Sequence, residues 1–267
     1  MDLKMIVSDL DGTLLNDRSV ISDRTAEVLQ QASAAGVVVV AATGRSIYSA
    51  LDLLRPIGVV SWALCSNGAT KFHLDEERLV DHRLIPYGDV QNFLMRVRRR
   101  YGEVGLAWET QSALQWDHFY QAHRDRLVPR PKRQEGRIAP FPAGSDLVKL
   151  LITHPERTHD EWLGDLKPLI GHTMVASTSG TDFVEITHAS ATKGQAIADL
   201  CAELAIDPEN VAAFGDQTND VDMLQWAGRG YAMANAAPAV KAVATHQAPH
   251  HAEDGVAQVI SALIDAC

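Results

Sequence analysis

Two aspartates follow directly after a short apolar stretch near the start of the sequence. Residues 5–8 read Met-Ile-Val-Ser, and Asp9 and Asp11 stand in the Asp-Leu-Asp-Gly-Thr segment that comes next. The apolar stretch is typical of a buried strand, and Gly12 allows a sharp turn that lets both carboxylates face one point. Two such oxygen ligands suit Mg²⁺, which leaves part of its coordination to water and substrate phosphate. Taken alone, the segment is equally typical of an ordinary Asp-Gly turn.

Further apolar runs of the same kind also end in polar, mostly glycine-flanked clusters. They are residues 37–42 before Thr43-Gly44-Arg45, residues 62–65 before Ser66-Asn67-Gly68, residues 211–214 before Gly215-Asp216, and residues 230–234 before Asn235. Short unbroken apolar runs are typical of a parallel sheet that is buried on both faces. Ligands of such sheets bind outside the carboxyl ends of the strands, so we expect these clusters to converge on one site.

Helical patterns separate the apolar runs. We expect helices over residues 23–34 with Ser22 as N-cap, after Arg45 as far as Pro56, from near Thr192, from Asn219-Asp220, and from about Gly255. The alternation of strands and helices predicts an α/β fold with a doubly wound parallel sheet.

The pattern changes between the third apolar run and residue 190. Residues 69–74 and 78–84 predict a hairpin, and strands or helices of mixed order are expected over 90–100, 105–115, 146–153, 159–170 and 173–187. The stretch is domain-sized and predicts an inserted α+β module with its own sheet. We therefore expect a core made of residues 1–85 and 189–267, and an inserted module of residues 86–188 with hinges near Pro86 and residues 187–190.

Composition limits the function classes. At 267 residues with 46% hydrophobic content, the chain can bury a large core. It contains no apolar stretch of about 18 residues and starts almost at once with a core strand, so we expect neither a membrane helix nor a signal peptide. Three unpatterned cysteines fit a reducing cytoplasm, and a net charge of −10 argues against a nucleic-acid partner. The sequence leaves the oligomeric state open.

The second half of the chain adds a lysine and a second acidic cluster. Lys193 stands at a predicted helix start, where it could share an anion with free N–H groups or simply be solvated. The segment Gly215-Asp216-Gln217-Thr218-Asn219-Asp220 supplies an amide and two acids at a strand-to-helix turn. An ordinary helix cap would explain Asp220 but would leave Asp216 unexplained.

Together these residue types predict phosphoryl transfer, which needs positioning and charge stabilisation more than covalent chemistry. Asp9 can attack phosphorus, and Asp11 can protonate the leaving group and then activate water. The phosphoryl oxygens would be held by Thr43, the Gly44 N–H and Lys193, and Mg²⁺ by Asp9, the Asp11 carbonyl and Asp216.

In motif order the sequence resembles the haloacid dehalogenase-like phosphatases, and in detail their Cof-type branch. The resemblance is carried by Asp9-Leu10-Asp11-Gly12-Thr13, Thr43-Gly44-Arg45, Ser66-Asn67-Gly68-Ala69, Val184-Glu185-Ile186, Lys193-Gly194, Gly215-Asp216 with Asp220, Met233-Ala234-Asn235-Ala236 and Glu253-Asp254-Gly255-Val256-Ala257. It implies a Rossmann-like core, an inserted cap, a Mg²⁺ requirement and hydrolysis of small phosphorylated metabolites, often sugar phosphates.

Motif position also implies roles for single residues. Asp9 would be the nucleophile and Asp11 the acid/base. Phosphate would be bound by Thr43, Gly44, Lys193 and Asn219, and substrate would be contacted by Arg45 and Asn67. The metal site would be formed by Asp9, Asp11, Asp216 and Asp220, with Asp220 acting through water.

The chain departs from the family pattern at two places. Ala234 stands where many relatives have Gly, and His250-His251 replaces the usual Ser-Asn before the late Glu-Asp-Gly-Val segment. With His246, these histidines could form a transition-metal cluster, but a solvated histidine-rich loop is the simpler interpretation.

The predicted cap contains a basic segment preceded by aromatic residues. Residues 124–137 are rich in Arg and Lys and read either as a solvated loop or as an element that attracts an anionic substrate. The aromatic residues upstream are expected to form cap core rather than a sugar-stacking surface, and they are Trp108, Trp116, Phe119 and Tyr120.

Two other classes of protein use similar residues. A receiver-type regulatory module also places acids, Thr and Lys around an acyl phosphate, although Asp11 and the large insertion argue against it. A phosphosugar mutase of the same superfamily would return the phosphoryl group to a sugar rather than to water. We therefore expect a phosphatase, with the mutase as the nearest alternative.

Overall fold

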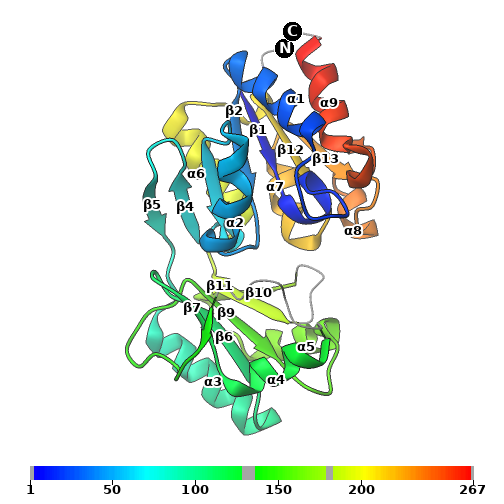
Figure 1. Cartoon of the computed structure of the whole chain (residues 1–267). Helices are drawn as coiled ribbons and strands as arrows, with labels where there is room; N and C mark the ends of the chain where they lie inside the picture. The colour runs from blue at the N-terminus through cyan, green and yellow to red at the C-terminus, as the bar shows by residue number, and fades with distance from the viewer. Residues whose placement is uncertain (1–2, 128–135, 179–182, 266–267) are drawn as a thin grey trace. The chain divides into compact units, whose positions relative to one another are not determined.

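The computed structural model describes residues 3–127, 136–178 and 183–265 of the chain (Figure 1). Its internal contacts divide the chain into two compact units. One consists of Met1–Asp81 and Thr192–Cys267, and the other of His82–Ala191. Each unit has its own sheet and its own apolar core.

The first unit is built on an eight-stranded sheet with the order β14-β13-β12-β1-β2-β3-β4-β5. Its strands are β1 Met5–Ser8, β2 Val38–Ala42, β3 Trp62–Cys65, β4 Thr70–His73, β5 Arg78–His82, β12 Val211–Gly215, β13 Arg229–Met233 and β14 His246–Ala248. Neighbours from β14 to β3 run parallel, and β4 turns back antiparallel to β3. The fully buried β1, β3 and β12 confirm that unbroken apolar runs indicate a sheet covered on both faces.

The helices of the first unit cover both faces of this sheet (Figure 1). They are α1 Asp23–Ala34, α2 Ile47–Leu54, α6 Lys193–Leu204, α7 Val221–Trp226, α8 Pro238–Lys241 and α9 Gly255–Asp265. α1 packs with α9, and α6 packs with α7. Right-handed crossovers that leave the sheet centre in opposite directions must lie on opposite faces, so the predicted doubly wound α/β core is confirmed.

Local side-chain caps explain where three of these helices begin. The side chains of Ser22, Ser46 and Thr192 each accept a hydrogen bond from the backbone N–H three residues later. Such caps satisfy amide groups that the first helical turn leaves without partners. The predicted starts near residues 22 and 192 are therefore confirmed.

The centre of the sheet is also the point where the winding reverses. β1 pairs with β2 on one side and with β12 on the other, and the chain proceeds outward in both directions. Ligands of open α/β sheets bind outside the carboxyl ends of strands at such a switch point. Asp9 follows β1 and Asp216 follows β12, so the two acids stand side by side at this place.

The second unit has a six-stranded sheet with the order β10-β11-β9-β6-β7-β8. Its strands are β6 Gly105–Glu109, β7 Leu114–Trp116, β8 Arg137–Ile138, β9 Lys149–Thr153, β10 Met174–Ser177 and β11 Val184–His188, and its helices are α3 Tyr87–Tyr101, α4 His118–Leu127 and α5 His159–Leu166. The strand pairs are antiparallel apart from β7 with β8. The fold is thus the expected α/β core with an inserted α+β cap.

The aromatic residues of the second unit mostly confirm the expected cap core. Trp108, Trp116 and Tyr120 are buried, whereas Phe119 is 55% exposed. Helix α4, which carries Phe119 and Tyr120, was not among the predicted elements because its polar residues show no clear apolar period.

Strand β14 is a second element that the sequence did not predict, because His246 and Gln247 are polar. Most of the basic segment 124–137 lies outside the described residues, but Arg124 lies over the ring of Trp116 at 5.2 Å.

Across the described ranges, no helix combines the length and apolar composition needed to cross a membrane.

Candidate active site

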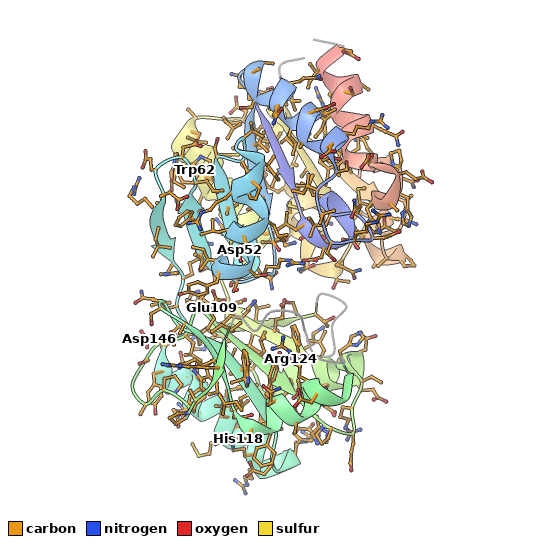
Figure 2. All side chains as sticks on the ribbon, viewed as in Figure 1. Asp52, Trp62, Glu109, His118, Arg124 and Asp146 are labelled. Atoms are coloured by element: carbon orange, nitrogen blue, oxygen red, sulfur yellow. The ribbon has the colours of Figure 1, made fainter. Side chains whose placement is uncertain are left out.

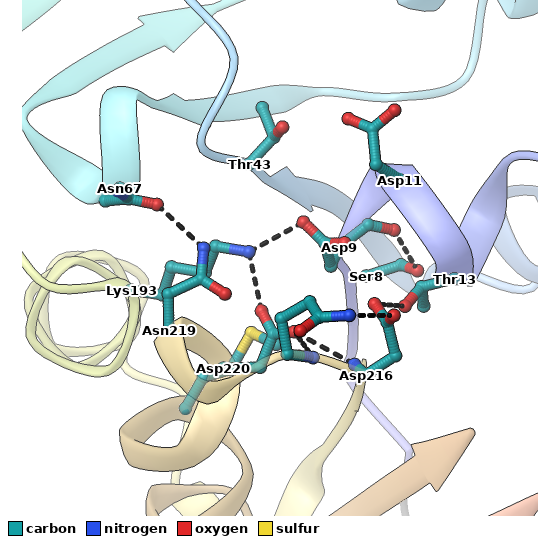
Figure 3. Close-up of polar contacts among 12 residues, drawn as sticks. Ser8, Asp9, Asp11, Thr13, Thr43, Asn67, Lys193, Asp216, Asn219 and Asp220 are labelled. Carbon is teal, nitrogen blue, oxygen red and sulfur yellow. Dashed lines mark hydrogen bonds and ion pairs between the residues drawn. The ribbon is translucent and has the colours of Figure 1, made fainter. Parts of the chain in front are cut away.

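A buried lysine joins two aspartates at the carboxyl end of the central strands (Figure 3). The Lys193 Nζ donates to Asp9 Oδ1 at 2.6 Å and to Asp220 Oδ1 at 2.5 Å. The side chains of Lys193 and Asp220 are fully buried, and that of Asp9 is 8% exposed. The solvated-lysine alternative is therefore wrong, because Lys193 starts α6 with its ammonium turned into the carboxylates.

A third aspartate is held beside this pair from both sides. The hydroxyl of Thr13 donates to Asp216 Oδ1 at 3.1 Å, and Gln217 Nε2 donates to Asp216 Oδ2 at 3.1 Å. The backbone N–H of Asp216 donates to Asp220 Oδ2 at 2.9 Å. Gly12 has φ +78°, and a Cβ there would stand 2.5 Å from Asp216 Oδ2. The motif thus requires glycine for both its backbone conformation and its close approach to Asp216.

Three buried carboxylates share one ammonium, and the pKa values of Asp9 and Asp216 are raised. Burial raises the pKa of Asp9 well above its ordinary value; Lys193 opposes the rise, and the charges of Asp220 and Asp216 add to it. Burial and the charge of Asp220 raise the pKa of Asp216 to about 6. Burial by itself would lower the pKa of Lys193, but Asp220 and Asp9 raise it above its ordinary value. The cluster therefore favours an additional cation.

The donor set fits a hard divalent metal ion. Ligand oxygens of Asp9, Asp216 and Asp220 all lie within 4.8 Å of one another, and among the described residues this is the only such group of His, Cys, Asp and Glu. Three carboxylates and one ammonium leave a formal charge of −2, which a divalent cation would neutralise. Oxygen-only ligation is what Mg²⁺ prefers.

Asp11 lies apart from this cluster, and Figure 3 shows its carboxylate turned away from the other acids. Arg45 holds it in a two-pronged ion pair, with Nε at 2.7 Å from Oδ2 and Nη2 at 2.6 Å from Oδ1. The Asp11 side chain is 54% exposed. Arg45, for which contact with substrate remains a prediction, is paired with Asp11 in this structure.

The remaining predicted residues line neighbouring strand ends. Thr43 is buried at the end of β2, where its hydroxyl accepts from the Arg45 N–H at 3.0 Å. Asn67 is buried after β3, and its side-chain oxygen accepts from Asn219 Nδ2 at 3.0 Å. This bond joins two segments separated by 152 positions, and it brings the two predicted amide groups together.

The late histidines do not form the cluster considered as an alternative. Among the described residues, no group of potential metal ligands includes His246, His250 or His251. His250 Nδ1 accepts from the Ala252 N–H at 3.1 Å, and the His251 side chain is only 15% exposed. The expectation of a solvated loop is thus wrong for His251, whose ring packs against the chain near Leu15.

Sequence reasoning missed some residues that support the site. Thr13 and Gln217 orient Asp216, as described above, and Asp222 Oδ2 accepts from the Gly194 N–H at 3.0 Å at the start of α6. Asp222 ties the helix that carries Lys193 to α7. Its place in the first turn of a predicted helix was the available signal, but that signal does not reveal which helix an acid caps.

The family follows from this fold and site together with sequence comparison. The sequence profile of the haloacid dehalogenase-like hydrolases matches residues 6–260, and the chain belongs to this family. Within the family it is a phosphatase, a phosphoric monoester hydrolase.

Individual relatives match nearly the whole chain. Phosphatase YwpJ of Bacillus subtilis (strain 168) is 26% identical over 98% of this chain and 100% of its own length. The 5-amino-6-(5-phospho-D-ribitylamino)uracil phosphatase YwtE of the same organism is 28% identical over 98% of each chain. The solved structure of a sugar phosphatase of HAD subclass IIB has a TM-score of 0.84 at 22% identity and covers 97% of this chain and 98% of that chain. Membership in this hydrolase family sets the receiver-type alternative aside.

Proposed function

We propose that this chain is a Mg²⁺-dependent phosphatase that hydrolyses small phosphate monoesters, including sugar phosphates, through an aspartyl-phosphate. The observation that carries the proposal is the buried Asp9 at the end of β1, held by Lys193 at 2.6 Å with Asp216 and Asp220 beside it. Lys193 fixes the direction of the Asp9 carboxylate and can neutralise part of the charge of a phosphoryl anion, and Asp216 and Asp220 would hold a cation beside it.

In the first step an Asp9 oxygen forms a bond to phosphorus while the ester P–O bond breaks. Asp11 gives its proton to the departing alkoxide. In the second step Asp11 takes a proton from water, whose oxygen attacks phosphorus and releases inorganic phosphate and free Asp9. Thr43, the Gly44 N–H, Lys193 and Asn219 hold the phosphoryl oxygens.

The acidic side of the site would hold the metal. Asp9, Asp216 and the Asp11 carbonyl would ligate Mg²⁺ directly, and Asp220 would act through water. When bound, the ion supplies positive charge to the phosphoryl oxygens. Asp220 also holds Lys193 and the Asp216 N–H, so it keeps both neighbours in place.

A screen of phosphorylated metabolites tests the proposal. Purified protein should release inorganic phosphate from sugar phosphates or similar small esters with Mg²⁺ and not with EDTA. Acid quench during turnover should trap a phosphoryl group on Asp9, identified by peptide mass. Absence of Mg²⁺-dependent release from every ester, including p-nitrophenyl phosphate, would overturn it.

The mutase alternative is decided by product analysis. A hexose phosphate incubated with the enzyme should yield free hexose and inorganic phosphate. Recovery of an isomeric hexose phosphate without inorganic phosphate would identify a mutase instead.

Asp11→Asn should separate esters by their leaving groups. An alkoxide needs a proton on departure, whereas p-nitrophenolate needs little help. We expect kcat on a sugar phosphate to fall by about 10²–10⁴-fold, and the loss on p-nitrophenyl phosphate to be much smaller. Steady-state kinetics on both substrates measure this, and equal losses would exclude the Asp11 side chain as the proton donor to the leaving group.

Asp216→Asn should weaken the binding of Mg²⁺, because it removes one negative charge from the proposed metal site. It leaves the nucleophile Asp9 in place. We expect the Mg²⁺ concentration for half-maximal activity to rise by about tenfold or more. The rise in melting temperature on adding Mg²⁺, read by thermal shift, should shrink in parallel. Glu209→Gln, which alters an exposed acid before β12, is the matched control. An unchanged titration would place Asp216 outside the metal site.

Substrate choice is proposed to reside in residues 86–188, with residues 1–85 and 189–267 as the catalytic core. The residues at the strand ends of the core would contact only the phosphoryl group and the leaving oxygen, which all phosphate monoesters share. Discrimination between different substrates therefore needs other side chains. The second unit carries three buried charged residues on adjacent strands, Glu109, Lys149 and Glu185, with Lys149 Nζ at 3.8 Å from Glu185 Oε1. Glu109 is labelled in Figure 2.

Glu109→Gln keeps the shape of this group and removes its charge. We expect the ratio of kcat/KM between two sugar phosphates to change by about tenfold, with p-nitrophenyl phosphate hydrolysis nearly unchanged. A parallel change on all substrates would contradict the assignment.

The three unpatterned cysteines, of which Cys65 and Cys201 are buried, support a cytoplasmic location.

A further inference from the structure

The loop that carries the nucleophile is also held from outside the active site. This loop, residues 9–15, receives a hydrogen bond from Asn235, whose Nδ2 donates to the Gly12 carbonyl at 2.7 Å. The backbone N–H of His251 in turn donates to Asn235 Oδ1 at 3.2 Å. Asn235 follows β13 and His251 lies 16 positions later, so two late segments meet at this loop.

The ring of His251 makes a second contact with the same loop. Its Nδ1 lies 2.8 Å from the Leu15 carbonyl oxygen. A carbonyl oxygen can only accept, so Nδ1 carries a proton and donates it. The other ring nitrogen, Nε2, lies 3.3 Å from Asp17 Oδ1. His251 therefore joins the end of the loop to the chain that follows it.

These outer contacts complement the inner ones. Inside, Thr13 donates to Asp216, and the loop closes on itself through the Leu14 N–H to the Asp9 carbonyl at 3.2 Å. Outside, the Gly12 carbonyl has Asn235 as its donor. Gly12 is conformationally permissive and stands between Asp11 and Thr13, so the direction of its peptide affects both neighbours.

We propose that Asn235 and His251 are positioning residues that hold the 9–15 loop in the geometry required for phosphoryl transfer. This inference rests on the proposed function and adds residues for which the motif resemblance implies no role. His251 occupies one of the positions where the chain departs from the family pattern. The contacts of its ring with Leu15 and Asp17 would give the histidine at this position a structural role.

Asn235→Ala and Asn235→Asp test the contact to Gly12. Aspartate keeps an acceptor for the His251 N–H but removes the donor and sets a carboxylate against the Gly12 carbonyl. Because small misplacements of reacting groups cost up to about 10²-fold in rate, we expect both variants to lose about 10- to 100-fold in kcat on p-nitrophenyl phosphate. KM should change by less than about threefold, since the phosphate ligands of other strands remain.

His251→Phe tests the second contact. Phenylalanine keeps an aromatic ring against His250, which stacks on His251 at 4.7 Å, and removes both ring nitrogens. We expect a loss of about 3- to 10-fold in kcat that does not multiply with the loss of Asn235→Ala, because both act on one loop. His250→Asn is the matched control: it keeps an N-cap acceptor for the Ala252 N–H and should leave kcat within twofold.

Hydrogen exchange of the 9–15 peptide separates failure of this inference from failure of the proposed function. Asn235→Ala should exchange the Leu14 and Leu15 amides faster than wild type, and His250→Asn should not. An inactive wild type would overturn the proposed function, and the exchange result would still judge the contact. An active wild type whose Asn235 variants keep full kcat, or lose activity only through a raised KM, would overturn the inference.

Discussion

Asp9→Asn is expected to abolish turnover while leaving the fold intact. An amide cannot serve as the attacking oxygen, so kcat should fall by about 10⁴-fold or more. The replacement is isosteric and still offers an oxygen to Lys193, which lies 2.6 Å from Asp9 Oδ1 in the native protein. It also removes a charge that burial, Asp220 and Asp216 disfavour. The melting temperature should therefore be equal to or higher than that of the wild type.

Phosphate release and differential scanning calorimetry on the same preparation check this result. Asp75→Asn, which alters an exposed acid in the β4–β5 turn, is the control for losing one carboxylate and should behave as wild type. Phosphate release at wild-type rate from the Asp9 variant would exclude Asp9 as nucleophile. A lowered melting temperature would instead show that the charge of Asp9 stabilises the fold.

Lys193→Met should have the largest effect on stability. Lys193 is fully buried and is shared by Asp9 and Asp220, so its removal leaves buried carboxylates without their cation. Breaking a buried ion pair on one side costs about 3–5 kcal/mol, and we expect a loss of this order in the free energy of unfolding in EDTA. Activity should fall by about 10²–10³-fold, because a preorganised donor to the phosphoryl oxygens is lost.

The double variant Lys193→Met/Asp220→Asn provides the decisive comparison. Neutralising the second partner should recover part of the stability, measured by urea unfolding, but not the activity. Lys71→Met removes an ammonium from an ion pair whose partner, Glu203, is 49% exposed. That change should cost only about 0–1 kcal/mol. Equal destabilisation by both single variants would contradict a special role for the buried charge of Lys193.

The elements of the fold were largely readable from the sequence because their signals are local. The apolar run at residues 62–65 coincides with β3, and the capped pattern at residues 23–34 coincides with α1. Burial on two faces and amide capping both act over a few neighbouring positions. Where local polarity hid the signal, as at β14 and α4, prediction failed because packing rather than pattern placed those segments.

The chemical types at the site were also readable, since Asp9, Asp216 and Lys193 each follow a strand or begin a helix. Parallel strands carry such residues to one edge of a sheet, which predicts their approach without fixing their contacts. Lys193 contacts Asp9, which lies 184 positions away in the sequence, and Asp220, which lies 27 positions away. Only packing of α6 against α7 decides that the ammonium lies between two acids rather than in solvent.

The pairing of side chains was decided by the tertiary structure alone. Arg45 pairs with Asp11 across 34 positions, Thr13 bonds Asp216 across 203, and Asn235 reaches the Gly12 carbonyl across 223. A hydrogen bond requires a donor–acceptor distance that is correct to within a few tenths of an ångström and a suitable direction. No periodicity or spacing in the sequence encodes this distance or direction for residues so far apart in the chain. The sequence therefore specified which groups could do phosphoryl chemistry, and the folded chain determined which of them hold one another in place.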